Sequence, residues 1–346
     1  MQRVAILSAF VVLAWVVLVV PSSGNEKVSF ENKTIKLIAP TTVGGSTDIA
    51  ARLMARFFAK YLPGNPTVVV QNMPGGAGVP PLNFFAQQVK PDGLTMLLSS
   101  NSEADPMTFR KPQASYDPSR LEIIGGIGYG NNVVVIRTEA IPRLLDKSQP
   151  PVLFGAVAGA PRGAMRMNIW GPLFLGWNTK WVSGYPGSAD LVLAMQRGEV
   201  EMTTFPDYYL HNRLSDLTKY KVIYIDGLNP NARPSGRPDI DNAPKFIDAM
   251  KDKINDPKIL AAFDYWRGTS TFKWMALPPG TPKEIRDVYR EAYIKIAPDP
   301  EFREQAAKVM ESYVLLTPEE MSRRIQELAA TSDEAVKTME SLLPKK

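Results

Sequence analysis

The glycine pair Gly44-Gly45, followed by Ser46, Thr47 and Asp48, is the part of the sequence best suited to holding a ligand. Glycine lets a backbone approach another molecule closely, and the free N–H groups in the first turn of a helix point the same way. With the positive end of the helix dipole, these groups favour an anion, most simply a carboxylate or a phosphate. The alternative is a tight connection without a ligand. No Lys-Ser or Lys-Thr follows the glycines, and G-x-G-x-x-G is absent, so neither common nucleotide loop is present.

Residues for covalent or metal chemistry are scarce. The chain has no cysteine and a single histidine, His211. Disulfides, thiol catalysis and cysteine-rich metal sites are therefore excluded, and we expect no metal ion and no cofactor. A secreted α/β hydrolase remains an alternative, but its catalytic triad would depend on His211 and no G-x-S-x-G elbow accompanies it.

Alternating elements place the glycine loop at one edge of a sheet. The sequence predicts a strand over 34–39 and a helix over 47–61 whose N-cap is Ser46 or Thr47. Strands over 67–71 and 94–99, with a helix over 79–89 between them, extend the pattern to β-α-β-α-β. The loops that follow these strands lie at the carboxyl ends, where open α/β sheets bind ligands.

The same rhythm restarts in the second half, which predicts a second α/β domain. Strands are expected over 150–157, 180–182, 200–205 and 220–225, with a loop over 158–163. A strand over 271–277 and helices over 282–296, 300–311 and 317–340 complete the chain. Thr317-Pro-Glu-Glu320 is a capping box that begins the last helix.

The net charge bears on nucleic-acid binding, and the N-terminus indicates a location outside the cytoplasm. Of 346 residues, 40 are Lys or Arg and 35 are Asp or Glu, which gives a net charge of +5, and the basic residues are scattered. This distribution does not support nucleic-acid binding. Arg3 precedes an apolar run from Val4 to Val20 and a small-residue exit, which predicts a signal peptide over 1–24. An uncleaved membrane anchor is the alternative.

Several motifs in this order resemble a known family. They are the stretch 34–48, VVVQNMPGGAG (68–78), PDGLTMLLSS (91–100), VSGYPGSADLVLAMQRGEVEM (182–202), FKWMALPPGTPKEI (272–285) and TPEEM (317–321). Spread over about 300 residues, they resemble the Bug-type periplasmic receptors of tripartite tricarboxylate transporters. The resemblance implies an α/β, two-domain periplasmic-binding-protein fold of the Venus-flytrap, type II-like kind, with mainly parallel sheets. Domain 1 would comprise 33–135 and 270–346, and domain 2 would comprise 136–269, with hinge crossovers between them.

The resemblance also implies a function without catalysis. A small organic anion, a carboxylate, would lie in the cleft and be held by backbone N–H groups and hydroxyls. Domain closure would then deliver it to membrane permease subunits. A ligand-sensing adaptor for a membrane sensor kinase is the alternative, and a monomer is expected. Carried over onto this sequence, the ligand-binding residues are Thr41, Thr42, Gly44, Gly45, Ser46, Thr47, Asp48, Gly75, Gly76, Gly78, Ser99, Asn101, Ala160, Arg162, Gly163, Tyr185 and Asp207.

Three positions depart from the family pattern. Thr41-Thr42-Val43 replaces an aromatic-small-Pro/Ala run, and Val79-Pro80 stands where a polar residue is common. The loop of domain 2 has Arg162 and Arg166 instead of a hydroxyl residue followed by a histidine. Either arginine could contact a carboxylate directly or be a solvated surface charge.

Overall fold

The computed structural model describes residues 28–128, 130–158, 163–207, 210, 213–229, 234–269, 272–310 and 313–344. The predicted signal peptide (1–24), Ala160, Arg162 and His211 lie outside these ranges. Within the described ranges, each helix is too short or too polar to span a membrane.

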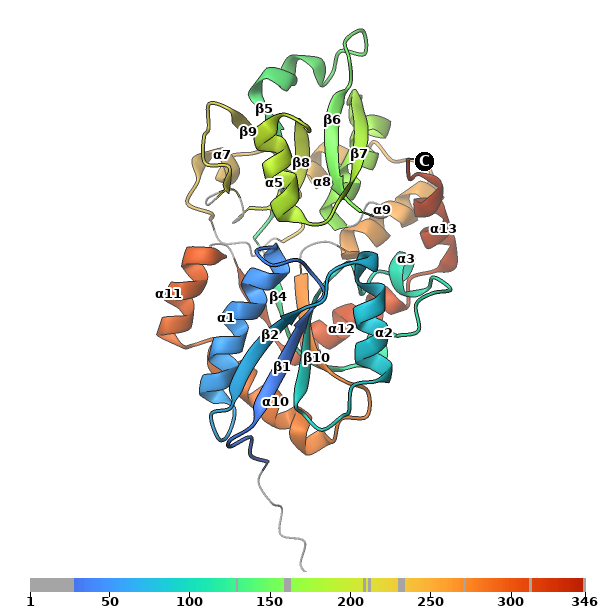
Figure 1. The fold of residues 1–346 in the computed structure, drawn as a ribbon. Helices are drawn as coiled ribbons and strands as arrows, with labels where there is room; N and C mark the ends of the chain where they lie inside the picture. The colour runs from blue at the N-terminus through green and yellow to red at the C-terminus, as the bar shows by residue number, and fades with distance from the viewer. Residues whose placement is uncertain are drawn as a thin grey trace, which may run out of the picture.

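The first lobe is built on a six-stranded sheet in the order β11-β4-β10-β3-β1-β2 (Figure 1). Strands β2 and β3 both pair with β1 in parallel, whereas β10 runs antiparallel to β3 and β4, and β11 runs antiparallel to β4. The strands are β1 (Thr34–Ala39), β2 (Thr67–Asn72), β3 (Thr95–Ser100), β4 (Glu122–Gly128), β10 (Phe272–Leu277) and β11 (Val314–Leu316).

The second lobe is built on a five-stranded sheet in the order β7-β6-β8-β5-β9. Strand β6 pairs in parallel with β7 and β8, and β5 runs antiparallel to β8 and β9. These strands are β5 (Asn132–Arg137), β6 (Val152–Val157), β7 (Thr179–Tyr185), β8 (Met202–Pro206) and β9 (Tyr220–Ile225).

The prediction of two mainly parallel α/β sheets is confirmed, although both sheets are mixed: β10 and β11 run against the other strands of the first sheet, and β5 runs against those of the second. The reason is the crossing of the chain between the sheets. Strand β10 enters the first sheet at the end where β1 and β3 finish, because it follows helix α9 (Pro257–Thr269) of the second lobe. A strand that starts at that edge must run against its neighbours. Strand β5 enters the second sheet in the same way after β4.

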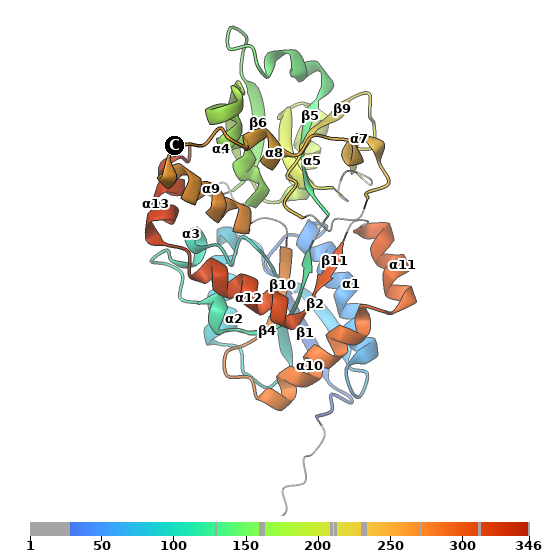
Figure 2. The same ribbon diagram turned by 180° about the vertical axis from the view of Figure 1, so that it is seen from behind.

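Helices cover both faces of the first sheet. Alternate residues of β10 show the division: Met275 and Leu277 pack with α1 (Ser46–Tyr61), α10 (Lys283–Ile296) and α11 (Pro300–Val309). Trp274 and Ala276 pack on the other face with α2 (Val79–Gln87) and α12 (Pro318–Ala329). Figure 2 shows α10 and α12 from behind. The apolar spacing read from the sequence in α1 is the buried face of that helix.

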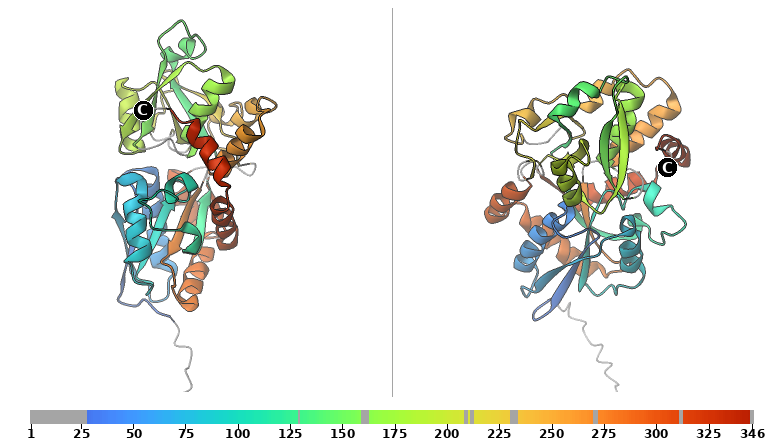
Figure 3. Two further views of the ribbon diagram at one scale, coloured as in Figure 1. Left: turned by 90° about the vertical axis from the view of Figure 1, so that its right-hand side faces the viewer. Right: turned by 45° about the horizontal axis from the view of Figure 1, so that its top comes forward.

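The C-terminal helix predicted over 317–340 is two helices. The capping box of Thr317 and Glu320 starts α12 as expected, but Ser332 caps a separate helix, α13 (Asp333–Ser341). The break lets α13 leave the first sheet and pack against α9, where Val336 and Met339 join the core of the second lobe (Figure 3). The sequence-based division had assigned this stretch to domain 1, and its exact domain boundaries stay a prediction.

Candidate functional site

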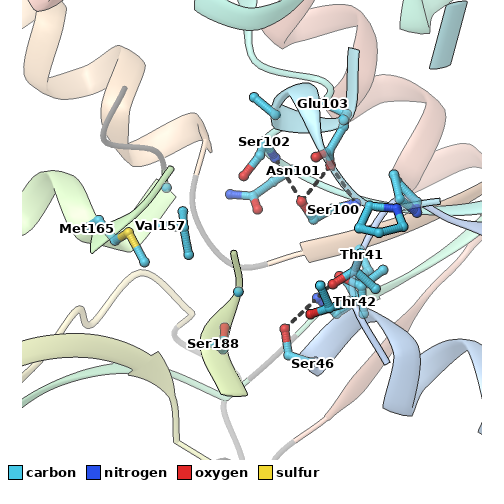
Figure 4. Close-up of a pocket in the computed structure, with 18 of the residues that line it drawn as sticks. Thr41, Thr42, Ser46, Ser100, Asn101, Ser102, Glu103, Val157, Met165 and Ser188 are labelled. Atoms are coloured by element: carbon cyan, nitrogen blue, oxygen red, sulfur yellow. Dashed lines mark hydrogen bonds between the residues drawn. The ribbon is translucent and has the colours of Figure 1, made fainter. Parts of the chain in front are cut away.

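A cavity of about 440 Å³ lies between the two lobes. Ligand-binding pockets commonly have volumes of roughly 300–1,000 Å³, so the cavity can hold a small molecule. In Figure 4, Thr41, Thr42, Ser46 and Ser100–Glu103 approach from the first lobe, and Val157, Met165 and Ser188 from the second.

Nine of the predicted site residues line this cavity. They are Thr41, Thr42, Ser46, Thr47, Gly75, Gly76, Gly78, Asn101 and Gly163. Gly44, Gly45, Asp48, Ser99, Tyr185 and Asp207 lie outside its lining. A ligand-binding role for each stays a prediction.

Asp48 stabilises the first loop by hydrogen bonds and lies outside the cavity lining. Its carboxylate accepts hydrogen bonds from the Gly44 N–H at 2.8 Å and the Asn72 side chain at 2.8 Å, and Arg52 also donates to it. Burial raises the pKa of Asp48, but the hydrogen bonds outweigh that effect and leave the pKa below its usual value. Asp48 is therefore used in holding the loop.

The first turn of α1 differs from the expected capping. Gly45 is the N-cap, without a side-chain cap, so the prediction of Ser46 or Thr47 as N-cap is wrong. Both hydroxyls instead accept hydrogen bonds from Lys273, whose Nζ lies 3.2 Å from Ser46 Oγ and 3.0 Å from Thr47 Oγ1. Gly45 leaves little room, because a Cβ there would lie 2.7 Å from Thr41 Oγ1.

The second glycine loop is a left-handed turn beside Glu103. Gly75, Gly76 and Gly78 all have positive φ, and Gly78 has φ of 81°. A Cβ on Gly78 would lie 2.5 Å from Glu103 Oε1. Glycine is required here for both reasons.

Glu103 organises the third loop, and the sequence analysis did not single it out. Its Oε2 accepts hydrogen bonds from Ser99 Oγ at 3.1 Å and from Ser100 Oγ at 2.6 Å and N–H at 3.0 Å. Ser99 is thereby turned away from the cavity, whereas Ser100 and Asn101 line it. The second-loop glycines and Glu103 form one packed unit.

Lys273 is the other charged residue that sequence reasoning missed. Among the described lining residues, Lys273 and Glu103 alone carry charged side chains. Lys273 is 4% exposed, and burial lowers its pKa to about 7, while the charge of Glu103 acts in the opposite direction. A lone lysine in the apolar strand FKWMAL was the available sequence signal.

Arg166 lies outside the described cavity lining and is not a surface charge. Its guanidinium is fully buried and forms an ion pair with Asp105 at 2.5 Å. Tyr265 donates a hydrogen bond to the same carboxylate, and the Arg166 guanidinium lies 5.3 Å from the Tyr265 ring centroid. These contacts join the segment after β3 to the second lobe.

Tyr185 and Asp207 stand behind the second-lobe wall. Asp207 is fully buried, and its carboxylate accepts a hydrogen bond from the Asn131 N–H at 3.0 Å. Burial raises the pKa of Tyr185, and the neighbouring charge of Glu199 raises it further. Neither residue is among the described residues that line the cavity.

Two hydroxyl oxygens at the cavity lack hydrogen-bond partners within the described part of the chain. One is Thr42 Oγ1 in the first lobe, and the other is Thr204 Oγ1 on β8 in the second. Thr204 is 4% exposed. Buried polar groups are nearly always hydrogen-bonded, so such atoms at a cavity indicate a polar ligand or water there.

Comparison with known proteins finds relatives in sequence and in fold. No protein-family model matches the chain. A UPF0065 protein of Bordetella pertussis is 26% identical over 282 residues, which cover 79% of each protein. Protein BugT of the same organism is 43% identical over 74 residues, which cover 21% of this chain and 22% of BugT.

Solved structures agree in fold. The periplasmic binding protein BugD superposes with a TM-score of 0.67 at 19% identity, covering 90% of this chain and 99% of BugD. MatC of Rhodopseudomonas palustris with bound malate gives 0.64 at 16% identity, covering 89% and 98%. An R. palustris protein solved with adipate gives 0.68 at 18% identity, covering 89% and 97%. The fold is that of the periplasmic solute-binding proteins. The resemblance to Bug-type receptors predicted from the sequence is confirmed.

Proposed function

We propose that this protein is an extracytoplasmic receptor that binds a small carboxylate in the cavity between its lobes and delivers it to a tripartite tricarboxylate-type membrane transporter. The observation that carries the proposal is the first-lobe wall. There the first turn of α1, the left-handed turn of Gly75, Gly76 and Gly78, and the hydroxyls of Thr41, Ser46 and Ser100 face one cavity.

This wall has the chemistry of an anion site. Backbone N–H groups at a helix N-terminus and hydroxyl donors suit a carboxylate, and the helix dipole favours negative charge. Malate and adipate occupy two of the structural neighbours, and both are carboxylates of a size suited to such a cavity. Export through the predicted signal peptide would place the receptor in the periplasm.

Closure of the lobes around the ligand is testable at Gly187. This residue lies in the second lobe, yet a Cβ on it would lie 2.8 Å from Thr42 Oγ1 of the first lobe. Its φ of −166° is extended, so Gly187→Val adds no backbone strain but holds the lobes apart at that point. Gly268→Ala, where the nearest atom would lie 3.5 Å away on Leu328, is the matched control.

The test is a thermal-shift screen with malate, adipate, citrate, benzoate and aspartate, with glucose as a neutral comparison. A ligand that binds only the native state raises the melting temperature in a saturable way. We expect a carboxylate to do so with the wild type and with Gly268→Ala, and to do so much less with Gly187→Val. No shift with any carboxylate would contradict the proposed function.

A further inference from the structure

Lys273 occupies the cleft end of an otherwise apolar strand. It points to the same face of β10 as Met275 and Leu277, the face covered by α1. Since β10 enters its sheet at the cleft, Lys273 comes to lie on the cavity floor, in contact with the Ser46 and Thr47 hydroxyls. The long cationic side chain of Lys273 is therefore buried at the cavity, with 4% of its surface exposed.

The electrostatics around Lys273 are unfavourable for a cation. Its ammonium lies against the first turn of α1, where the helix dipole also presents positive charge. Burial disfavours the charged form, and the pKa of about 7 compares with an ordinary value of 10.5. An anion in the cavity, beside the ammonium and the N-terminus of α1, would be attracted by both.

The acidic side chains around this part of the cavity already have hydrogen-bond or ion-pair partners of their own. Glu103, on the loop after β3, is the described group whose charge favours the ammonium. Asp48 on α1 is paired with Arg52, and Asp226 in the second lobe lies behind Asn132, which donates to it at 2.7 Å. Across the cavity, the unpartnered hydroxyl of the buried residue Thr204 is a second, independent sign of a polar ligand.

We propose that Lys273 is the charged anchor of the cavity: its ammonium pairs directly with the carboxylate of the ligand. Because burial lowers the pKa of Lys273, this pairing predicts that a proton is taken up on binding as the pH rises above about 7. This inference rests on the proposed function and adds to it. A receptor built only from backbone N–H groups and hydroxyls would bind a carboxylate without such a change in protonation.

Proton uptake has a defined dependence on pH. In the unliganded protein, Lys273 loses its proton as the pH rises through about 7. A bound carboxylate favours the charged form, so it raises the pKa of Lys273. With one linked proton, affinity falls by up to about tenfold for each pH unit above that point.

Three variants separate charge, titration and general effects. Lys273→Met has a similar length and removes the charge, Lys273→Arg keeps a charge that does not titrate, and Lys36→Met alters an exposed lysine of β1 in the same sheet. Loss of a charged hydrogen bond predicts about 10- to 150-fold weaker binding in Lys273→Met. Lys273→Arg is expected to bind with little change between about pH 6 and about pH 9, because arginine stays charged.

The experiment measures binding of malate, adipate, citrate, benzoate and aspartate by calorimetry across that pH range, in buffers of different ionisation enthalpy. The wild type and Lys36→Met should take up close to one proton near pH 8 and bind more weakly as the pH rises, while the Lys273 variants take up none. Wild-type binding that Lys273→Met leaves unchanged would overturn the anchor and spare the proposed function. If Lys273→Met does not fold, equal pH profiles for the wild type and Lys273→Arg would overturn it. Absence of binding by every carboxylate would overturn the proposed function, and the anchor with it.

Discussion

The two walls of the cavity differ in the charge of the described residues that line them. The first-lobe wall brings Lys273 and Glu103 to the cavity surface, among glycine turns and hydroxyls. Among the described residues, the second-lobe wall lines the cavity with neutral groups, including Val157, Met165 and Thr204, and Arg166 lies outside this lining. Under the proposed function, this difference predicts that the first lobe recognises the charge of a ligand, whereas the second supplies shape and closes over it.

Arg166 shows the contrast most clearly, because it is as buried as Lys273 but faces the protein. Its ion pair with Asp105, and the hydroxyl of Tyr265, form a closed unit where the lobes meet. Lys273 has hydroxyl partners at the cavity instead. The buried charge of Arg166 is therefore paired within the protein, whereas that of Lys273 lines the cavity.

The largest predicted effect is on stability at Arg166. Arg166→Met leaves Asp105 buried without its counter-charge, and breaking a buried pair in this way costs about 3–5 kcal/mol. Urea unfolding should show this loss, and the double variant with Asp105→Asn should recover much of it. A stable single variant would contradict the structural role and remove the contrast between the walls.

The next effect concerns Asp226, a buried carboxylate behind the second-lobe wall. Burial, with a smaller contribution from the charge of Asp207, raises its pKa to about 6 from an ordinary 3.8. Between these two values the folded state binds the proton more tightly than the unfolded chain does. The stabilisation from this proton is present below about pH 4 and is lost as the pH rises through about 6.

Asp226→Asn should therefore remove that loss. The shift corresponds to a stability change on the order of 3 kcal/mol between acid and neutral pH, after which the contribution is constant. Urea unfolding of the wild type and the variant at several pH values measures it. Parallel pH profiles for the two proteins would contradict the assignment.

The smallest effect is expected at the Thr204 hydroxyl. Thr204→Val removes an unpartnered buried oxygen, so the unliganded protein should keep its stability or gain slightly. If the ligand bonds to this oxygen, binding weakens by about 0.5–1.5 kcal/mol. Thr179→Val is the control, because Thr179 Oγ1 is also buried without a partner but lies away from the cavity lining. Equal carboxylate affinities in the two variants would restrict polar recognition to the first lobe.

The first-lobe loops could be predicted from sequence because each depends on local signals. The strand patterns before Gly44, Gly75 and Asn101, with the helix patterns after the glycine loops, place the loops at one sheet edge. The glycines of the second loop also predict the positive φ angles that this loop adopts. Periodicity and turn chemistry act over a few residues, which is the range that a single sequence reports.

The missed residues depend on distant parts of the chain. Lys273 reaches α1 only because β10 returns from the second lobe, and this return also makes the first sheet mixed. The hydroxyls of Ser46 and Thr47 bond to Lys273 instead of capping their own helix, so a tertiary contact replaces a local preference. Arg166 forms its buried ion pair with Asp105, which lies 61 positions away in the chain.

The most direct test of the central claim is a crystal structure with the carboxylate that gives the largest thermal shift. The account predicts one carboxylate group within hydrogen-bonding distance of Lys273 Nζ and the first turn of α1, with the second lobe contacting the remainder of the molecule. A carboxylate held by the second lobe alone, out of hydrogen-bonding distance of Lys273 Nζ, would contradict it.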